Sequence, residues 1–128
     1  MQPTNQPMNK NEIITLILAD MRNRKLIMGL DAIGLSTDDF NTNLSYLIFS
    51  KMNIAKEHEV LVYNWYEDTV YYLLDTDMNK FREHQVFLAE RLYEMLEDKR
   101  AQLQKNMILK SETKFTFLQW VWGKRFDN

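Results

Sequence analysis

The sequence predicts an all-α protein, with four main helices in an antiparallel bundle and a short C-terminal helical segment. The 128 residues include only three glycines and two prolines, which is too few for a turn-rich β fold. Apolar residues recur three and four positions apart in several segments, and residues that commonly begin or end helices stand between these segments. A chain of this length is expected to form one domain, which we place at residues 10–128, after a disordered lead at residues 1–9.

The most apolar stretch is Val60–Asp75, VLVYNWYEDTVYYLLD. Its aromatic and β-branched residues favour a strand on propensity alone, but it has no glycine to form a tight hairpin turn. Polar residues in and just before it recur seven, four and seven positions apart, as along one stripe of a helix: Glu57, Asn64, Asp68 and Asp75. We therefore predict a helix here.

This predicted helix has two apolar faces. The first holds Tyr63, Tyr66, Val70, Leu73 and Leu74, and the second holds Leu61, Trp65 and Tyr72. A helix that is apolar around most of its circumference is usually surrounded by other elements. We therefore expect it at the centre of the bundle, with the second face covered by this chain or by another one.

The first helix is expected to begin at Asn9, whose side chain can cap it with Glu12 three positions on. Its apolar face is formed by Ile14, Ile17, Leu18, Met21 and Met28, while Arg22, Arg24 and Lys25 lie mostly on the other side. Gly29 stands where a kink or a close helix contact is expected. Gly34 stands where a left-handed residue would end the helix.

The second helix is expected to begin at Ser36, with Asp39 three positions on and with Leu35 and Phe40 placed as a hydrophobic staple. It should end between residues 52 and 55. The third helix should begin between residues 55 and 59.

A fourth helix is expected from about Lys80 to Lys105, with Asp77 or Asn79 as its cap. The remaining residues, 107–128, fit either a strand or a short fifth helix starting at Ser111 or Thr113. The helix is favoured, because a lone strand would have nothing to pair with.

Charge is distributed unevenly along the chain. Residues 31–77 carry nine acidic and two basic side chains, a net charge of −7, and residues 99–125 carry seven basic and one acidic, a net charge of +6. Such a chain can pair its own halves, pair with a second copy, or present its basic segment to an acidic partner.

The sequence predicts no catalytic residue, no metal ligand and no cofactor site, and hence no enzyme. It has no cysteine, and it lacks the glycine-rich loops that bind phosphates. A di-iron bundle needs Glu-x-x-His motifs, whereas Ala55 and Phe81 stand three positions before His58 and His84.

Nucleic-acid binding is disfavoured. Residues 30–40 loosely resemble a helix-turn-helix, but Asp38 and Asp39 at the start of the would-be recognition helix would repel phosphates. The basic segment Lys99–Arg125 is the better candidate for such binding. The aromatic and basic residues near the C-terminus also suit a membrane surface, although docking onto the bundle is the simpler interpretation.

The sequence has no run of about 18 apolar residues that could span a membrane, and its N-terminus lacks a signal-peptide pattern. We therefore expect a small, soluble, cytoplasmic protein that acts as a non-catalytic interaction or structural module. It would act through apolar helix faces, by homodimerisation or by binding another protein, and the candidate interface residues are Leu61, Trp65, Tyr72, Phe115 and Trp122. A monomer with a filled core is the competing interpretation. The alternative functions are a nucleic-acid-associated or regulatory protein, and a metal- or small-molecule-binding bundle enzyme.

Overall fold

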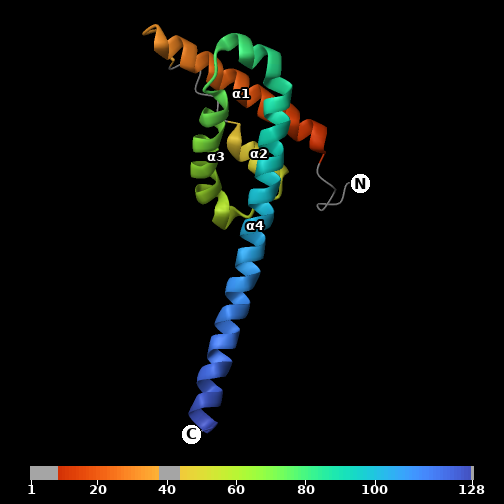
Figure 1. Cartoon of the computed structure of the whole chain (residues 1–128), viewed down its shortest axis with the longest axis vertical. Helices are drawn as coiled ribbons and strands as arrows, with labels where there is room; N and C mark the ends of the chain where they lie inside the picture. The colour runs from red at the N-terminus through yellow and green to blue at the C-terminus, as the bar shows by residue number, and fades with distance from the viewer. Residues whose placement is uncertain (1–8, 38–43, 128) are drawn as a thin grey trace. The chain divides into compact units, whose positions relative to one another are not determined.

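The computed structural model describes residues 9–37 and 44–127, with side chains as far as Asn106. These residues form an all-α fold without strands, which confirms the predicted fold class. The elements in chain order are α1 (Lys10–Ala32), α2 (Ser45–Lys51), the short 3₁₀ helix η2 (Lys56–His58), α3 (Glu59–Leu74) and α4 (Met78–Asp127) (Figure 1). No helix within the described ranges combines the length and the apolar character needed to cross a membrane.

The chain divides into two compact units, residues 1–97 and 98–128, and each is considered by itself. Within the second unit the backbone is helical as far as Asp127, so the helical interpretation of the C-terminal residues is confirmed. It is part of α4, however, and no break at Ser111 or Thr113 begins a separate helix. The predicted single domain at residues 10–128 stays a prediction.

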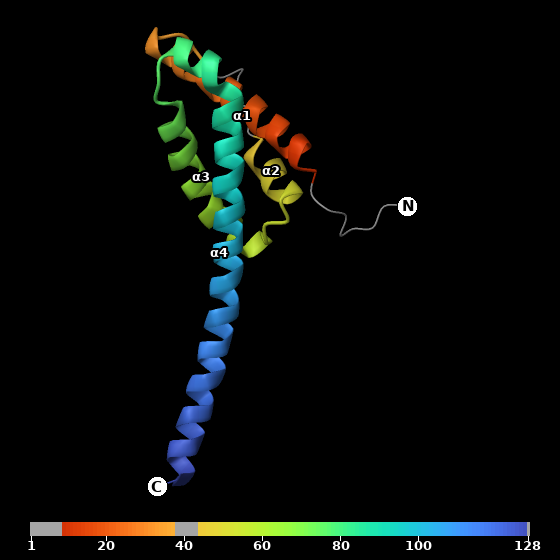
Figure 2. The ribbon, with the colours of Figure 1, turned by 45° about the vertical axis from the view of Figure 1, so that its right-hand side comes forward.

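In the first unit, α3 and the beginning of α4 run antiparallel and are joined by a short connection at residues 75–77 (Figures 1 and 2). Helix α1 runs obliquely across them in both views. Helix α2 contacts α1 and α3, and α1 also contacts α3. This arrangement is the predicted small bundle.

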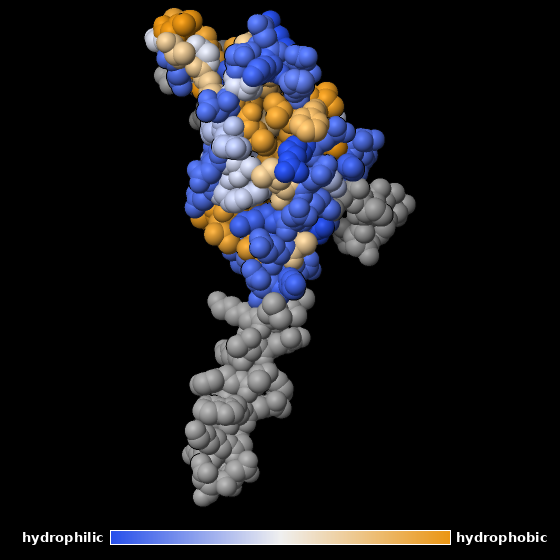
Figure 3. All heavy atoms as spheres, viewed as in Figure 1, coloured by the Kyte–Doolittle hydropathy of each residue, from blue (hydrophilic) through white to orange (hydrophobic). Residues whose placement is uncertain are grey.

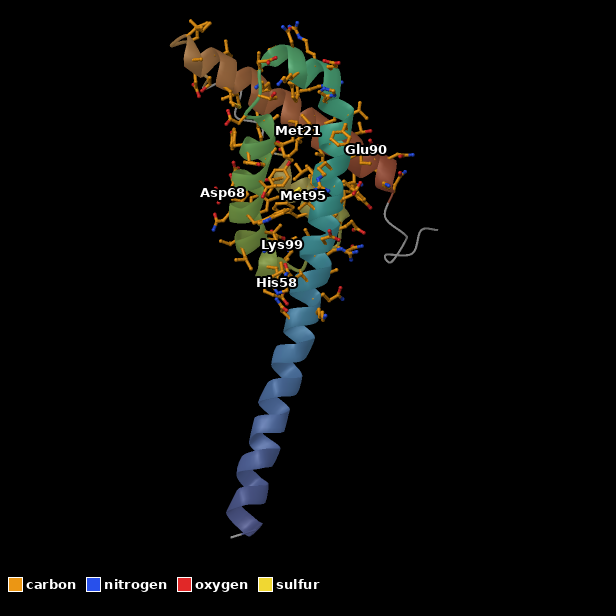
Figure 4. All side chains as sticks on the ribbon, viewed as in Figure 1. Met21, His58, Asp68, Glu90, Met95 and Lys99 are labelled. Carbon is orange, nitrogen blue, oxygen red and sulfur yellow. The ribbon has the colours of Figure 1, made fainter. Side chains whose placement is uncertain are left out.

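All four helices contribute to the core of the first unit. Met21 and Met95 lie between the helices (Figure 4). The buried apolar side chains include Ile13, Ile17, Met21, Ile48, Phe49, Val62, Tyr66, Val70, Leu74, Ala89, Leu92 and Leu96. The predicted apolar face of the first helix is correct at Ile17 and Met21, whereas Ile14 is only half-buried and Ile13 takes the core position.

Local sequence signals set the starts of α1 and α4, as predicted from their capping residues. The side-chain oxygen of Asn9 accepts a hydrogen bond from the backbone N–H of Glu12 at 3.1 Å. Asp77 accepts one from the backbone N–H of Lys80 at 2.8 Å. These bonds satisfy backbone donors that have no partner within the helix.

Gly34 ends α1 as predicted. Its φ angle is +77°, and its N–H donates to the carbonyl of Asp31 at 3.1 Å, while the N–H of Leu35 donates to the carbonyl of Leu30 at 3.0 Å. This is the hydrogen-bonding pattern of a left-handed C-terminal cap. No close helix contact occurs at Gly29, because no neighbouring atom within the described residues lies within 4 Å of where its Cβ would be.

The second helix begins later than the sequence suggested. Helix α2 starts at Ser45, and Ser36 and Thr37 are not helical. The predicted contributions of Asp38, Asp39 and Phe40 to a helix start lie outside the described residues. The end of α2 at Lys51 agrees with the prediction within a residue or two.

Gly29 within α1 and Gly34 just after its end give a matched test of this geometry. Gly34→Ala is expected to lower the free energy of unfolding by about 1 kcal/mol, because an L-residue is strained at positive φ. Gly29→Ala is expected to raise it by up to about 1 kcal/mol, because Gly29 lies within the helix with room for a methyl group. Urea unfolding of both variants measures these changes, and equal effects of the two substitutions would contradict the left-handed cap.

Candidate interaction surface on α3

We define the outer face of α3 as Leu61, Trp65 and Tyr72. Leu61 is 53% exposed, Tyr72 is 80% exposed and Trp65 is half-buried. The side chains of α3 that enter the core belong to the other side of the helix: Val62, Tyr66, Val70 and Leu74. The described part of the chain leaves Leu61 and Tyr72 exposed, and the expectation that the outer face is covered by this chain or by another one stays a prediction.

Two further apolar side chains of α3 are exposed, each about 100° around the helix from the outer-face residue next to it in the chain. Val60 is 68% exposed and Tyr71 is 37% exposed. In the space-filling view, α3 carries hydrophobic atoms at its lower end and atoms of intermediate hydropathy along its middle, bordered by hydrophilic atoms (Figure 3). Exposed apolar and aromatic side chains grouped on one helix are typical of protein–protein contact sites.

The polar stripe predicted from the sequence runs beside the outer face. Glu57, Asn64, Asp68 and Asp75 are all exposed, and Asp68 lies on the side of α3 away from Met21 and Met95 (Figure 4). Among the described residues, none of the three carboxylates in this stripe takes part in an ion pair. The outer face is therefore apolar with an acidic border.

A partly buried ion pair holds the inner side of α3 against α1. The guanidinium of Arg24, on α1, donates from Nη1 to Glu67 Oε2 at 2.6 Å and from Nη2 to Glu67 Oε1 at 3.0 Å. Its Nε donates to Asp20 Oδ2 at 2.8 Å. The two parallel bonds to Glu67 match the planar shape of both groups and restrict their orientation.

Tyr66 completes the cluster. Its hydroxyl donates to Asp20 Oδ2 at 2.6 Å. The guanidinium of Arg24 lies 5.4 Å from the centre of the Tyr66 ring and 5.3 Å from that of Tyr71, within the range of cation–π attraction. Asp20 is fully buried, and its Oδ1 atom has no hydrogen-bond partner among the described residues. Two donors converge on its other oxygen.

These contacts shift three pKa values. Burial disfavours the charged form of Arg24, but the hydrogen bonds and charges of Glu67 and Asp20 outweigh it and raise the pKa of Arg24. Burial, followed by the charge and hydrogen bond of Asp20, raises the pKa of Tyr66. Burial would raise the pKa of Glu67, but hydrogen bonds from Arg24 and Tyr63 lower it overall. The cluster thus keeps Arg24 and Glu67 charged and Tyr66 neutral.

Lys25 holds the end of α3. Its Nζ donates to the carbonyl of Leu74 at 2.8 Å and also to the carbonyl of Thr76. Arg24 and Lys25 are only 6% and 8% exposed, so the prediction that they lie on the polar side of the first helix is wrong. The i, i+4 pair Asp20–Arg24 was visible in the sequence, but such pairs also occur on solvated helix surfaces.

The other two candidate interface residues, Phe115 and Trp122, belong to α4, and their side chains lie outside the described ones. Most of the basic side chains of residues 99–125 likewise lie beyond the described part.

No arrangement within the described residues suggests a metal centre. No group of three or more His, Asp or Glu side chains there could hold a metal ion, and His84 meets only the adjacent Glu83, at 4.0 Å. A shallow depression elsewhere in the first unit is lined by Lys10, Phe87, Glu90, Arg91 and Glu94. Its charges are mixed, and Phe87, Glu90 and Arg91 on its wall are exposed.

Comparisons with protein-family models, with curated proteins and with solved structures found no match for this chain.

Removing Arg24 tests the buried ion pair. Arg24→Ala is expected to lower the free energy of unfolding by roughly 3–5 kcal/mol, because it leaves the buried Asp20 without a counter-charge. The control is Arg22→Ala on the same helix. Arg22 is exposed and donates to Gln85 at 2.6 Å, so its loss should cost about 1 kcal/mol or less. Similar losses in the two variants, measured by urea unfolding, would contradict the central role of Arg24.

The lowered pKa of Glu67 predicts a pH dependence. A carboxyl whose pKa is depressed in the folded state stabilises the fold above its unfolded pKa, near 4.5 for Glu67. That stabilisation is lost as the pH falls through the lower, folded value. The wild type should therefore lose stability below about pH 4.5 more steeply than Glu67→Gln, as measured by urea unfolding at several pH values. Asp68→Asn serves as the control, because Asp68 is outside the cluster, and it should retain the wild-type slope.

Proposed function

We propose that this protein is a small non-catalytic helical module that self-associates through the outer face of α3. The observation that carries the proposal is the exposure of Leu61 and Tyr72 on a helix whose opposite side is fully buried. Apolar area removed from water on association contributes about 25 cal/mol per Å² before the costs of association are subtracted.

The setting of α3 supports this role. Arg24 fixes the helix from behind through Glu67, and Lys25 fixes its end through Leu74. The outer face is therefore presented in one orientation before any partner binds, which lowers the entropic cost of binding. Trp65 and Tyr72 are residue types enriched at interfaces, since each combines a large apolar area with a hydrogen-bonding group.

The charge distribution supports a second copy as the partner. The region that contains α3 carries a net charge of −7, and residues 99–125 carry +6. A second copy therefore provides the opposite charge, and closed dimers are the commonest soluble homo-oligomers. The cytoplasmic location and the absence of catalysis, both expected from the sequence, are part of this proposal.

Charging the outer face should abolish self-association. Tyr72→Asp places a carboxylate at the most exposed large apolar position of the described residues, so that association would have to desolvate it. The wild type is expected to be a dimer, and this variant a monomer, in size-exclusion chromatography with light scattering.

The matched control is Phe87→Asp, because Phe87 is 63% exposed on α4 and outside α3. This variant should remain dimeric, and circular dichroism should show that both variants keep the wild-type helix content. If the wild type is monomeric at a protein concentration of about 100 μM, its dimer Kd lies above the range of even weak association. That result would overturn the proposal. So would a Tyr72→Asp dimer.

A further inference from the structure

We infer that the outer face of α3 binds the basic C-terminal segment of a second copy, residues 105–125, and that two copies exchange this contact reciprocally. The inference rests on the proposed self-association and names the segment that covers the face. The basic segment is assigned from its sequence, and the acidic apolar face from the structure.

The acidic charge beside the outer face is unbalanced. Glu57, Asp68 and Asp75 are exposed, and no ion pair within the described residues neutralises them. By contrast, the adjacent Glu67 is paired with Arg24 on the inner side of the same helix. An apolar strip bordered by acids is complementary to an amphipathic helix with basic residues.

Residues 105–125 combine apolar and basic side chains on a helical backbone. The sequence carries Phe115, Leu118 and Trp122 at spacings of three and four, the helical period of an apolar strip. Its basic residues are Lys105, Lys110, Lys114, Lys124 and Arg125, against the single acid Glu112.

The same acidic side chains disfavour the simplest alternative, in which the α3 helices of two copies pack on each other. That arrangement would bring the carboxylates of Glu57, Asp68 and Asp75 from both copies to one interface, and like charges brought together oppose association. Contact with the basic segment replaces this repulsion by attraction.

The area that a stable interface must bury favours a reciprocal contact. Stable protein–protein interfaces bury about 1,200–2,000 Å² in total, which is large for one side of a helix of 16 residues. In a dimer with twofold symmetry every contact occurs twice. Reciprocal exchange of the basic segment therefore provides two equal contacts between an outer face and a segment, which doubles the total area that the dimer buries.

Charge reversal in two full-length variants tests the inference. The face variant is Asp68→Lys with Asp75→Lys, and the segment variant is Lys110→Glu with Lys114→Glu and Arg125→Glu, which changes the net charge of residues 105–125 from +4 to −2. Each variant alone brings like charges together, so its dimer Kd should rise at least about tenfold. When the two are mixed in equal amounts, the reversed face meets the reversed segment and the unchanged face meets the unchanged segment. The mixture should therefore dimerise like the wild type, as measured by sedimentation velocity at low ionic strength.

The outcomes separate this inference from the function on which it rests. A segment variant that alone dimerises as tightly as the wild type, while Tyr72→Asp is monomeric, overturns the inference and leaves self-association through α3 standing. Variants that stay monomeric on mixing also overturn it, because a contact between copies must be rescued in trans. A monomeric wild type overturns both. Circular dichroism of each variant confirms that a loss of association is not a loss of folding.

Discussion

The contact on which the first unit depends is the bidentate ion pair between Arg24 of α1 and Glu67 of α3. Taking charges out of water costs free energy that their mutual attraction often only offsets, so an ion pair shielded from water is weak evidence for added stability. What it supplies is orientation. Arg24 and Tyr66 also donate to the same carboxylate oxygen of Asp20. All of these bonds form together at one rotation of α3 relative to α1.

That orientation decides what α3 presents to solvent. A helix turns about 100° per residue. Rotating α3 by the angle of one residue would therefore move both Glu67 and Tyr66 away from α1 and would expose Val70. Lys25 adds a second restraint at the end of α3, through the carbonyl of Leu74. The exposure of Leu61 and Tyr72 is therefore a consequence of the buried cluster. The polar cluster thus holds the apolar outer face toward solvent. This is the physical basis for assigning that face to association.

Sequence reasoning predicted what depends on a few neighbouring residues. The caps at Asn9 and Asp77 and the left-handed Gly34 each involve bonds within one or two turns, and all three are present. The burial of Arg24 was missed because its main partner, Glu67, lies 43 positions away, and periodicity alone assigns a charged side chain to the surface. The grouping of Leu61, Trp65 and Tyr72 followed from spacing. Apolar spacing indicates that a face is suited to burial, but it does not indicate what buries it.

Glu67 and Asp68 are neighbours in the chain, and their environments differ completely. Glu67 points inward, where Arg24 provides the opposite charge and lowers its pKa. Asp68 points outward and has no ion-pair partner within the described residues. If α3 faced only water, an acidic border beside an apolar strip would serve solubility, but the strip itself would then expose Tyr72 without compensation. A partner that is apolar and basic satisfies both features at once, and residues 105–125 of a second copy have that composition.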